Sequence, residues 1–174
     1  MGSSSNEGKQ WIFDFIRGMK RDIKSILDIG PGQGTYHMIM SPLVPRAKWT
    51  GVEIFRPYID YYKLRNRYHK VIEEDIRTFH PVENYDIVFA GDVLEHMTKE
   101  EAVAVVDKFT PMCSYLIISI PIVKWVQGPI DGNPYEEHVK DDWSHDEVVS
   151  TFHNIEAHFV GEEVGVYVIR GYVV

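Results

Sequence analysis

Hydrophobic positions along the chain alternate between short apolar runs and longer stretches with helical spacing. The short runs predict strands at residues 25–29, 48–53, 69–73, 85–90 and 115–120. Apolar residues three and four positions apart predict helices at about 11–21, 35–41, 57–68, 99–109 and 144–152. Strands that alternate with helices are typical of an α/β fold with a parallel sheet.

The end of the chain departs from this alternation. Residues 155–160 and 164–173 are both rich in β-forming residues and are separated by only Gly161, Glu162 and Glu163. Three residues are too few for a crossover helix, so these two strands are predicted to form an antiparallel hairpin. Five β/α units closed by such a hairpin differ from the all-parallel arrangement of dinucleotide-binding domains.

Composition and charge narrow the class of protein. The chain has 174 residues, 44% of them hydrophobic and 25% charged, which predicts a single globular domain. The net charge of −8 disfavours nucleic acid as a partner. No apolar run approaches the ~18 residues of a membrane span, and the single Cys113 fits a reducing, cytoplasmic location. Residues 1–9 are expected to be a disordered leader or a cloning remnant, and residues 10–174 the domain.

A glycine-rich loop lies where the first strand should pass into its helix. It reads Asp28-Ile-Gly30-Pro-Gly32-Gln-Gly34. Glycine allows a sharp turn and close approach of a ligand, and the following helix directs free N–H groups at the same point. The spacing is G-x-G-x-G rather than the dinucleotide fingerprint G-x-G-x-x-G. Glu53, at the end of the second strand, is placed to accept hydrogen bonds from ribose hydroxyls, so a nucleoside-containing ligand is predicted.

Acidic residues lie at the ends of the first four predicted strands, as Asp28, Glu53, Asp75 and Asp92. In an open α/β sheet, ligands bind beyond the carboxyl ends of the strands. Any one of these acids could instead cap a helix, but four at the same edge favour a ligand with hydroxyl, amino and positively charged groups.

From residue 10 to 174 the chain resembles the class I S-adenosylmethionine-dependent methyltransferases. Their first loop, D/E-x-G-x-G-x-G, is matched by Asp28, Gly30, Gly32 and Gly34, and residues 85–96 are similar to the branch of ubiquinone-type O-methyltransferases. The resemblance implies a three-layer Rossmann-like sandwich. Its seven-stranded mixed sheet would have the order 3-2-1-4-5-7-6, with an antiparallel terminal hairpin. It also implies S-adenosylmethionine as cofactor and S-adenosylhomocysteine as product.

The resemblance assigns cofactor-binding roles as well. The glycine loop would contact the methionine portion, and Glu53 the ribose. Ile54 would flank the adenine, Asp75 would accept a hydrogen bond from its amino group, and the Ile76 N–H would reach the ring. The backbone near Asp92 would hold the methionine amino group.

Catalysis requires that the acceptor, the methyl carbon and the sulfur be aligned and that the acceptor lose a proton. Asp92, Glu95 and His96 converge if a helical turn follows Asp92. His96, His138 and Asp92 are the candidate catalytic residues, with His96 as general base. Two alternatives stay open. Glu95 and His96 could only orient the loop. Alternatively, Asp92, Glu95, His96 and His138 could hold a divalent ion, as in relatives with E-x-x-E-H. We predict no metal.

The long loop at 121–138 is the predicted mouth for the acceptor, with Trp125 and Tyr135 as its walls. The tyrosines of helix 57–68 are instead predicted to pack. We expect methyl transfer to an oxygen or nitrogen of a small molecule, by a monomer or a homodimer. The alternative is a non-catalytic S-adenosylmethionine-binding partner or scaffold subunit. A nicotinamide-dependent oxidoreductase is disfavoured by the glycine spacing and the hairpin.

Overall fold

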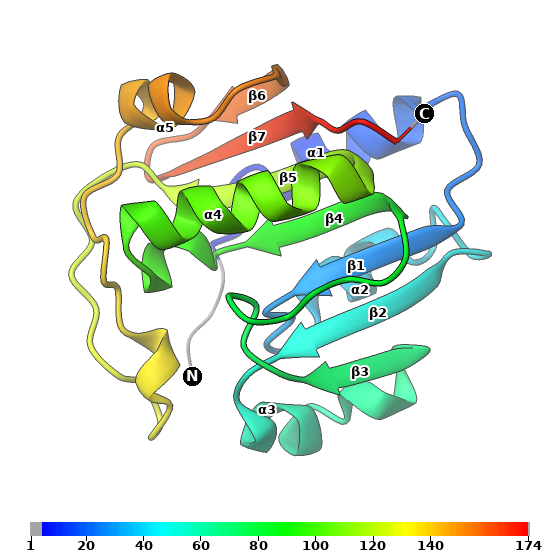
Figure 1. Cartoon of the computed structure of the whole chain (residues 1–174), viewed down its shortest axis with the longest axis horizontal. Helices are drawn as coiled ribbons and strands as arrows, with labels where there is room; N and C mark the ends of the chain where they lie inside the picture. The colour runs from blue at the N-terminus through cyan, green and yellow to red at the C-terminus, as the bar shows by residue number, and fades with distance from the viewer. Residues whose placement is uncertain (1–4, 174) are drawn as a thin grey trace.

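A single seven-stranded sheet runs through the computed structural model, which describes residues 5–173 (Figure 1). Its strands are β1 (Ser25–Ile29), β2 (Lys48–Glu53), β3 (Lys70–Glu73), β4 (Tyr85–Gly91), β5 (Cys113–Pro121), β6 (Ile155–Val160) and β7 (Val164–Arg170). The order is β3-β2-β1-β4-β5-β7-β6. Strands β1 to β5 pair in parallel, and β7 is antiparallel to both β5 and β6. The predicted topology, including the terminal hairpin, is confirmed.

Helices cover both faces of this sheet. They are α1 (Lys9–Gly18), α2 (Thr35–Met40), α3 (Arg56–Tyr61), α4 (Lys99–Phe109) and α5 (His145–Thr151). Helices α4 and α5 lie on one face and α1 and α2 on the other (Figure 1), and each face has its own buried apolar cluster. The three-layer sandwich is therefore confirmed. Among residues 5–173, no helix combines the length and the apolar character needed to cross a membrane.

The helix predicted at 57–68 is interrupted. Helix α3 ends at Tyr61, Lys63 adopts a left-handed conformation with φ 51°, and a 3₁₀ turn follows at Leu64–Asn66. Aromatic and β-branched residues lose side-chain freedom in a helix, and the sequence Tyr58-Ile-Asp-Tyr-Tyr62 is dominated by them. Helical spacing alone did not reveal this break.

The first helix is also shifted from its predicted bounds of about 11–21. Helix α1 ends at Gly18, a poor helix former, and Met19 is extended. Residues of the expected leader contact the domain. The Glu7 carboxylate accepts hydrogen bonds from the backbone N–H groups of Glu162, Glu163 and Val164, in the β6–β7 turn. Residues 1–4 of that segment lie outside the described residues.

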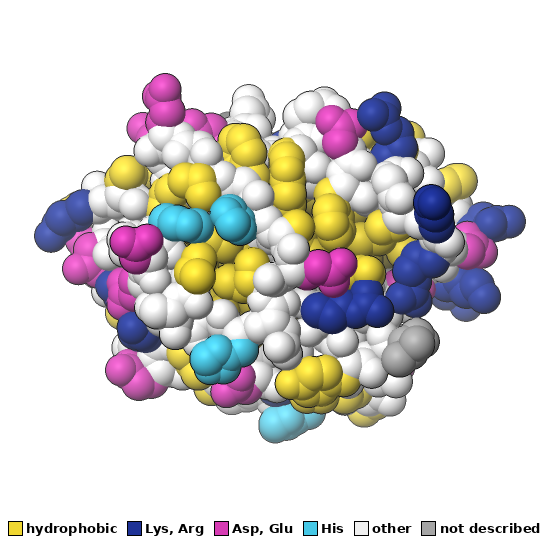
Figure 2. Space-filling model, turned by 90° about the horizontal axis from the view of Figure 1, so that it is seen from above, with side chains coloured by type: hydrophobic (Ala, Val, Ile, Leu, Met, Phe, Trp, Pro, Cys, Tyr) yellow, Lys and Arg dark blue, Asp and Glu magenta, His cyan; other side chains and the backbone are white. Residues whose placement is uncertain are grey.

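Strand β6 forms one edge of the sheet, and its side chains alternate between half-buried and exposed. Glu156 and His158 occupy exposed positions on it. Figure 2 shows the molecule from above, relative to the view of Figure 1. On this face the hydrophobic side chains gather near the middle, and the Lys and Arg side chains lie mostly toward one end. Charged side chains on an edge strand disfavour pairing with a further strand.

Gly91, the last residue of β4, lies against the ring of Tyr36. A Cβ at this position would lie 2.0 Å from Cε2 of that buried ring, which itself stacks on Phe89 with centroids 4.7 Å apart. We expect Gly91→Ala to lower the free energy of unfolding by about 1–3 kcal/mol, the usual cost of overpacking. Urea denaturation measures the change. Gly128→Ala is the control, since its Cβ would meet no atom within 4 Å. Equal losses in the two variants would contradict this packing.

Candidate active site

A cavity opens at the carboxyl ends of the parallel strands. The loop that follows β5 runs beside these strand ends (Figure 1). Its walls come from residues 29–33, 52–54, 74–77 and 91–97, together with positions of the loop between 121 and 138. This is the edge of the sheet where an open α/β fold binds its ligands. The cavity thus lies at the edge where the sequence predicts the site.

The glycine loop forms one wall of the cavity. Gly30, Gly32 and Gly34 have φ values of 58°, 50° and 80°, a region in which only glycine is free of strain. Gly30 and Gly32 line the cavity, and a Cβ at Gly32 would meet no atom within 4 Å. Gly34 lies away from it, with its Cβ position 2.8 Å from the Arg67 guanidinium. The loop backbone is thus open to a ligand at Gly32.

Glu53 ends β2 and is only 4% exposed, with its carboxylate in the cavity wall. Oε2 accepts a hydrogen bond from the Gly32 N–H at 3.2 Å, and Oε1 accepts one from the Phe55 N–H at 2.9 Å. Burial raises the pKa of Glu53 to about 7, although the two N–H groups oppose this shift. A buried acid at this position suits a ligand that brings hydroxyl donors.

The raised pKa of Glu53 predicts that the ligand-free protein loses stability as the pH rises from 4.5 to about 7. In this window the folded protein keeps a proton that the unfolded chain has released, so the free energy of unfolding falls with rising pH. Glu53→Gln lacks this proton. The slope of its free energy of unfolding against pH should therefore be less steep, by the contribution of about one proton. Urea denaturation of both proteins between pH 5 and pH 7.5 gives the two slopes. Identical slopes would show that Glu53 is ionised throughout.

Asp28 does not line the cavity, although the resemblance assigns it to the cofactor site. It is 1% exposed and accepts a hydrogen bond from the Tyr68 hydroxyl at 2.5 Å. Burial raises the pKa of Asp28 to about 7. Tyr68, which was expected only to pack, therefore has a polar partner.

The predicted adenine site is assembled at the ends of β2 and β3. Ile54, Asp75 and Ile76 all line the cavity. The Asp75 carboxylate accepts hydrogen bonds from Nε and Nη2 of Arg77 at 3.0 and 2.7 Å, which lower its pKa. Asp75 is thus an ionised acceptor at the edge of the cavity, with Arg77 fixed beside it.

Asp92 lines the cavity directly after β4, and its backbone is in the left-handed region with φ 55°. Ser119 donates a hydrogen bond to its Oδ1 at 2.8 Å, and the Lys9 ammonium lies 3.7 Å from Oδ2. Lys9 is only 5% exposed. These partners hold the Asp92 carboxylate, which does not join the cluster of ligand atoms that Glu95 and His96 form among the described residues.

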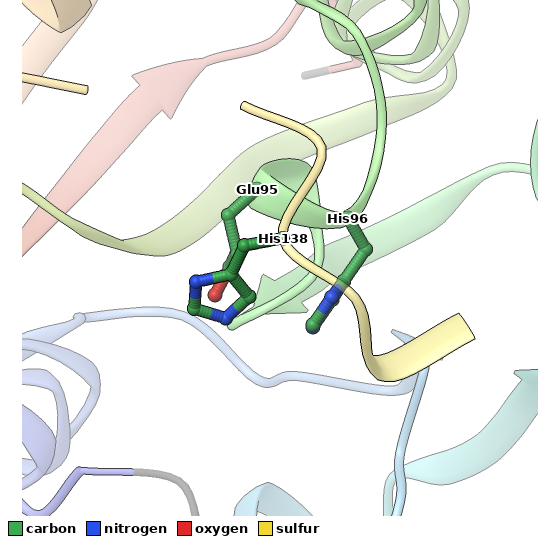
Figure 3. A group of neighbouring side chains, drawn as sticks. All are labelled: Glu95, His96 and His138. Atoms are coloured by element: carbon green, nitrogen blue, oxygen red, sulfur yellow. The ribbon is translucent and has the colours of Figure 1, made fainter. Parts of the chain in front are cut away.

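Glu95 and His96 converge instead with His138 (Figure 3). A 3₁₀ turn at Leu94–His96 carries the first two, and the long loop carries His138. One ligand atom from each of the three lies within 4.8 Å of the others, and the imidazole centroids are 5.0 Å apart. Burial raises the pKa of Glu95 well above its ordinary value and lowers that of His138. His138 is therefore a neutral imidazole near neutral pH.

Sequence reasoning missed several parts of the cavity wall. Tyr58 and Tyr62 line it, although their helical spacing indicated packing. Their position immediately after the acidic end of β2 was the signal that could have identified them. Lys9 does not line the cavity but pairs with Asp92, which does. It gave no signal, because a lysine at the start of an amphipathic helix is ordinarily exposed. Trp125 and Tyr135 line the cavity as predicted and are 36% and 45% exposed.

Solved structures similar to this chain are methyltransferases. A S-adenosylmethionine-dependent methyltransferase from Clostridium acetobutylicum has a TM-score of 0.72 at 11% identity, over 93% of this chain and 89% of its own. Mitomycin 7-O-methyltransferase MmcR has a TM-score of 0.67 at 14% identity, over 95% of this chain and 54% of its own. Coclaurine N-methyltransferase, bound to N-methylheliamine and S-adenosylhomocysteine, has a TM-score of 0.64 at 19% identity, with 91% and 52% covered.

The chain thus spans about half the length of the last two proteins. At these identities the likeness shows a shared fold. No curated protein sequence matches the chain. Residues 26–114, just over half of the chain, match the methyltransferase domain family. They include the glycine loop, Glu53 and the turn after β4. The chain belongs to the methyltransferase domain family.

Proposed function

We propose that the protein transfers a methyl group from S-adenosylmethionine to an oxygen or nitrogen of a small molecule. One observation carries the proposal. The open glycine backbone at Gly32 and the buried carboxylate of Glu53 face the same cavity as His96 and His138. A site for the methyl donor and a site for proton removal are therefore adjacent.

The residues present fit this cofactor. Glu53 provides a buried acceptor for the ribose hydroxyls, and Ile54 and Ile76 provide apolar surfaces for the adenine. Oδ2 of Asp92 has no hydrogen-bond partner among residues 5–173 and suits the methionine amino group. The cofactor supplies an electrophilic methyl carbon on a sulfonium. The protein supplies orientation, and the cavity walls exclude water from the reacting atoms.

The histidine pair is suited to accept the proton of the acceptor group. His96 Nδ1 lies 3.1 Å from the Glu137 carbonyl oxygen, and His138 Nδ1 lies 2.7 Å from that of Trp125. A carbonyl oxygen only accepts, so each Nδ1 carries a hydrogen and each Nε2 keeps its lone pair. Trp125 and Tyr135 at the mouth present aromatic surfaces to the acceptor.

Similar structures support a small acceptor, since two of them are named for methyl transfer to mitomycin and to coclaurine. Calorimetric titration with S-adenosylhomocysteine and with NAD tests the cofactor. We expect a 1:1 complex with the sulfur nucleoside and none with NAD. Absence of binding by S-adenosylhomocysteine would refute the proposal. Tight binding without turnover on phenol and amine acceptors would favour a non-catalytic subunit.

A further inference from the structure

Glu95, His96 and His138 form a cluster of two imidazoles and a carboxylate in the cavity wall (Figure 3). We propose that these three side chains bind a divalent transition-metal ion. The proposal departs from the expectation that the site holds no metal. The metal site lies in the same cavity as the proposed methyl transfer. Only the consequence for the acceptor rests on that proposed function.

Glu95 provides the first argument. The residue is 2% exposed, and its Oε2 has no hydrogen-bond partner among the residues that the structure describes. A buried carboxylate oxygen without a partner is costly to the folded protein. A cation between Glu95 and the two imidazoles would give this oxygen its missing partner.

The orientation of the imidazoles provides the second argument. The Nδ1–H groups of His96 and His138 point at the carbonyl oxygens of Glu137 and Trp125, at 3.1 and 2.7 Å. Histidines that bind metals usually donate their other ring N–H to a carbonyl or carboxylate in this way, which fixes the tautomer and the ring. Both Nε2 lone pairs are thus free for an ion.

Backbone hydrogen bonds hold the three donors together. The N–H groups of Val139 and Lys140 both donate to the Glu95 carbonyl oxygen, at 2.9 and 3.0 Å. The His138 N–H donates to the Gln127 carbonyl oxygen at 2.9 Å. Two ligands of one ion lie at most about 4.2 Å apart, twice the usual bond length. Each of the three residues has one ligand atom within 4.8 Å of the other two, which is close to the spacing that a shared ion requires.

Asp92 is excluded from this ligand set because Ser119 and Lys9 hold its carboxylate. Three protein ligands leave coordination positions open, which is typical of catalytic rather than structural metal sites. Two imidazoles and one carboxylate suit Zn²⁺, Fe²⁺ or Co²⁺ better than Mg²⁺ or Ca²⁺. An ion at this position faces the cavity and would stabilise a negatively charged acceptor oxygen. With the ion bound, the two imidazoles are its ligands, and the ion in place of an imidazole would assist loss of the acceptor proton by lowering the pKa of the acceptor hydroxyl. This favours hydroxyl-bearing acceptors over amines.

Titration of chelator-treated protein with Co²⁺ tests the site, followed by the visible absorption of the ion and by calorimetry. We expect one Co²⁺ per chain, and at least tenfold weaker binding in His96→Ala and in His138→Ala. Glu95→Gln is the variant of the third ligand. It keeps the size of the side chain, and circular dichroism verifies that this variant is folded. His153→Ala is the matched control, since His153 is exposed and outside the cavity wall. It should bind Co²⁺ like the unchanged protein.

Three outcomes would overturn the proposal. They are no stoichiometric Co²⁺ binding, binding unaffected by both cavity histidine substitutions, and equal weakening in His153→Ala. S-adenosylhomocysteine is titrated into the metal-free protein in parallel. If S-adenosylhomocysteine does not bind, the proposed function is contradicted. The titration with Co²⁺ still tests the metal site independently. Metal binding with no effect of the ion on methyl transfer to a phenol would refute the link to the acceptor.

Discussion

Glu53→Ala is expected to weaken S-adenosylhomocysteine binding by roughly 30- to 150-fold. Hydrogen bonds to a charged group contribute about 2–3 kcal/mol, and this carboxylate is 4% exposed in the cavity wall. The ribose hydroxyls would lose their acceptor, while the apolar surfaces of Ile54 and Ile76 remain. Calorimetry at neutral pH gives the dissociation constants of the two proteins.

Two further variants locate the effect at Glu53. Glu53→Gln keeps the shape and one acceptor oxygen, so its loss of affinity should be smaller than that of Glu53→Ala. Glu73→Ala removes an exposed acid at the end of the neighbouring strand β3 and should leave the affinity unchanged. If Glu53→Ala binds as tightly as the unchanged protein, the ribose lies elsewhere in the cavity.

Lys9→Met is expected to lower the free energy of unfolding by about 3 kcal/mol, because it leaves the partly buried charge of Asp92 without its cation. The side chains of Lys9 and Asp92 are 6% and 18% exposed and lie 3.7 Å apart. Methionine retains most of the apolar contacts of the lysine stem. Urea denaturation at pH 7 measures the loss.

The double variant Lys9→Met/Asp92→Asn separates charge from packing. It removes both charges, and asparagine can still accept the hydrogen bond from Ser119. We expect it to recover most of the stability that Lys9→Met loses. A double variant as unstable as the single one would show that Lys9 stabilises the fold by packing alone.

The sheet could be predicted from the sequence because each of its strands is defined by residues that are close together in the chain. Strands β1 and β2 have the predicted bounds, and a gap of three residues was enough to define the terminal hairpin. Ser144 caps α5 as its sequence suggests, through a hydrogen bond from the Glu147 N–H. The break at Lys63 was not predictable in this way, since the apolar spacing continues across it.

The site was predictable where it follows the strand ends and not where it depends on distant contacts. Glu53, Asp75 and His96 line the cavity as expected. Asp28 does not line the cavity. Its carboxylate instead accepts a hydrogen bond from the hydroxyl of Tyr68, which comes from a distant part of the chain. Asp92 is held by Lys9, which precedes it by 83 positions and belongs to another layer. No spacing rule relates residues so far apart.

The hydrogen bonds of Glu7 to the β6–β7 turn have a consequence for folding kinetics. They join residues 155 to 157 positions apart, and β7 inserts between β5 and β6. Contacts between remote parts of a chain slow folding because a large loop must close first. During synthesis, α1 therefore cannot dock in its final place until the last strands have left the ribosome. Lys9 reaches Asp92 from this same helix, so we expect the ion pair that holds this cavity residue to form late in folding.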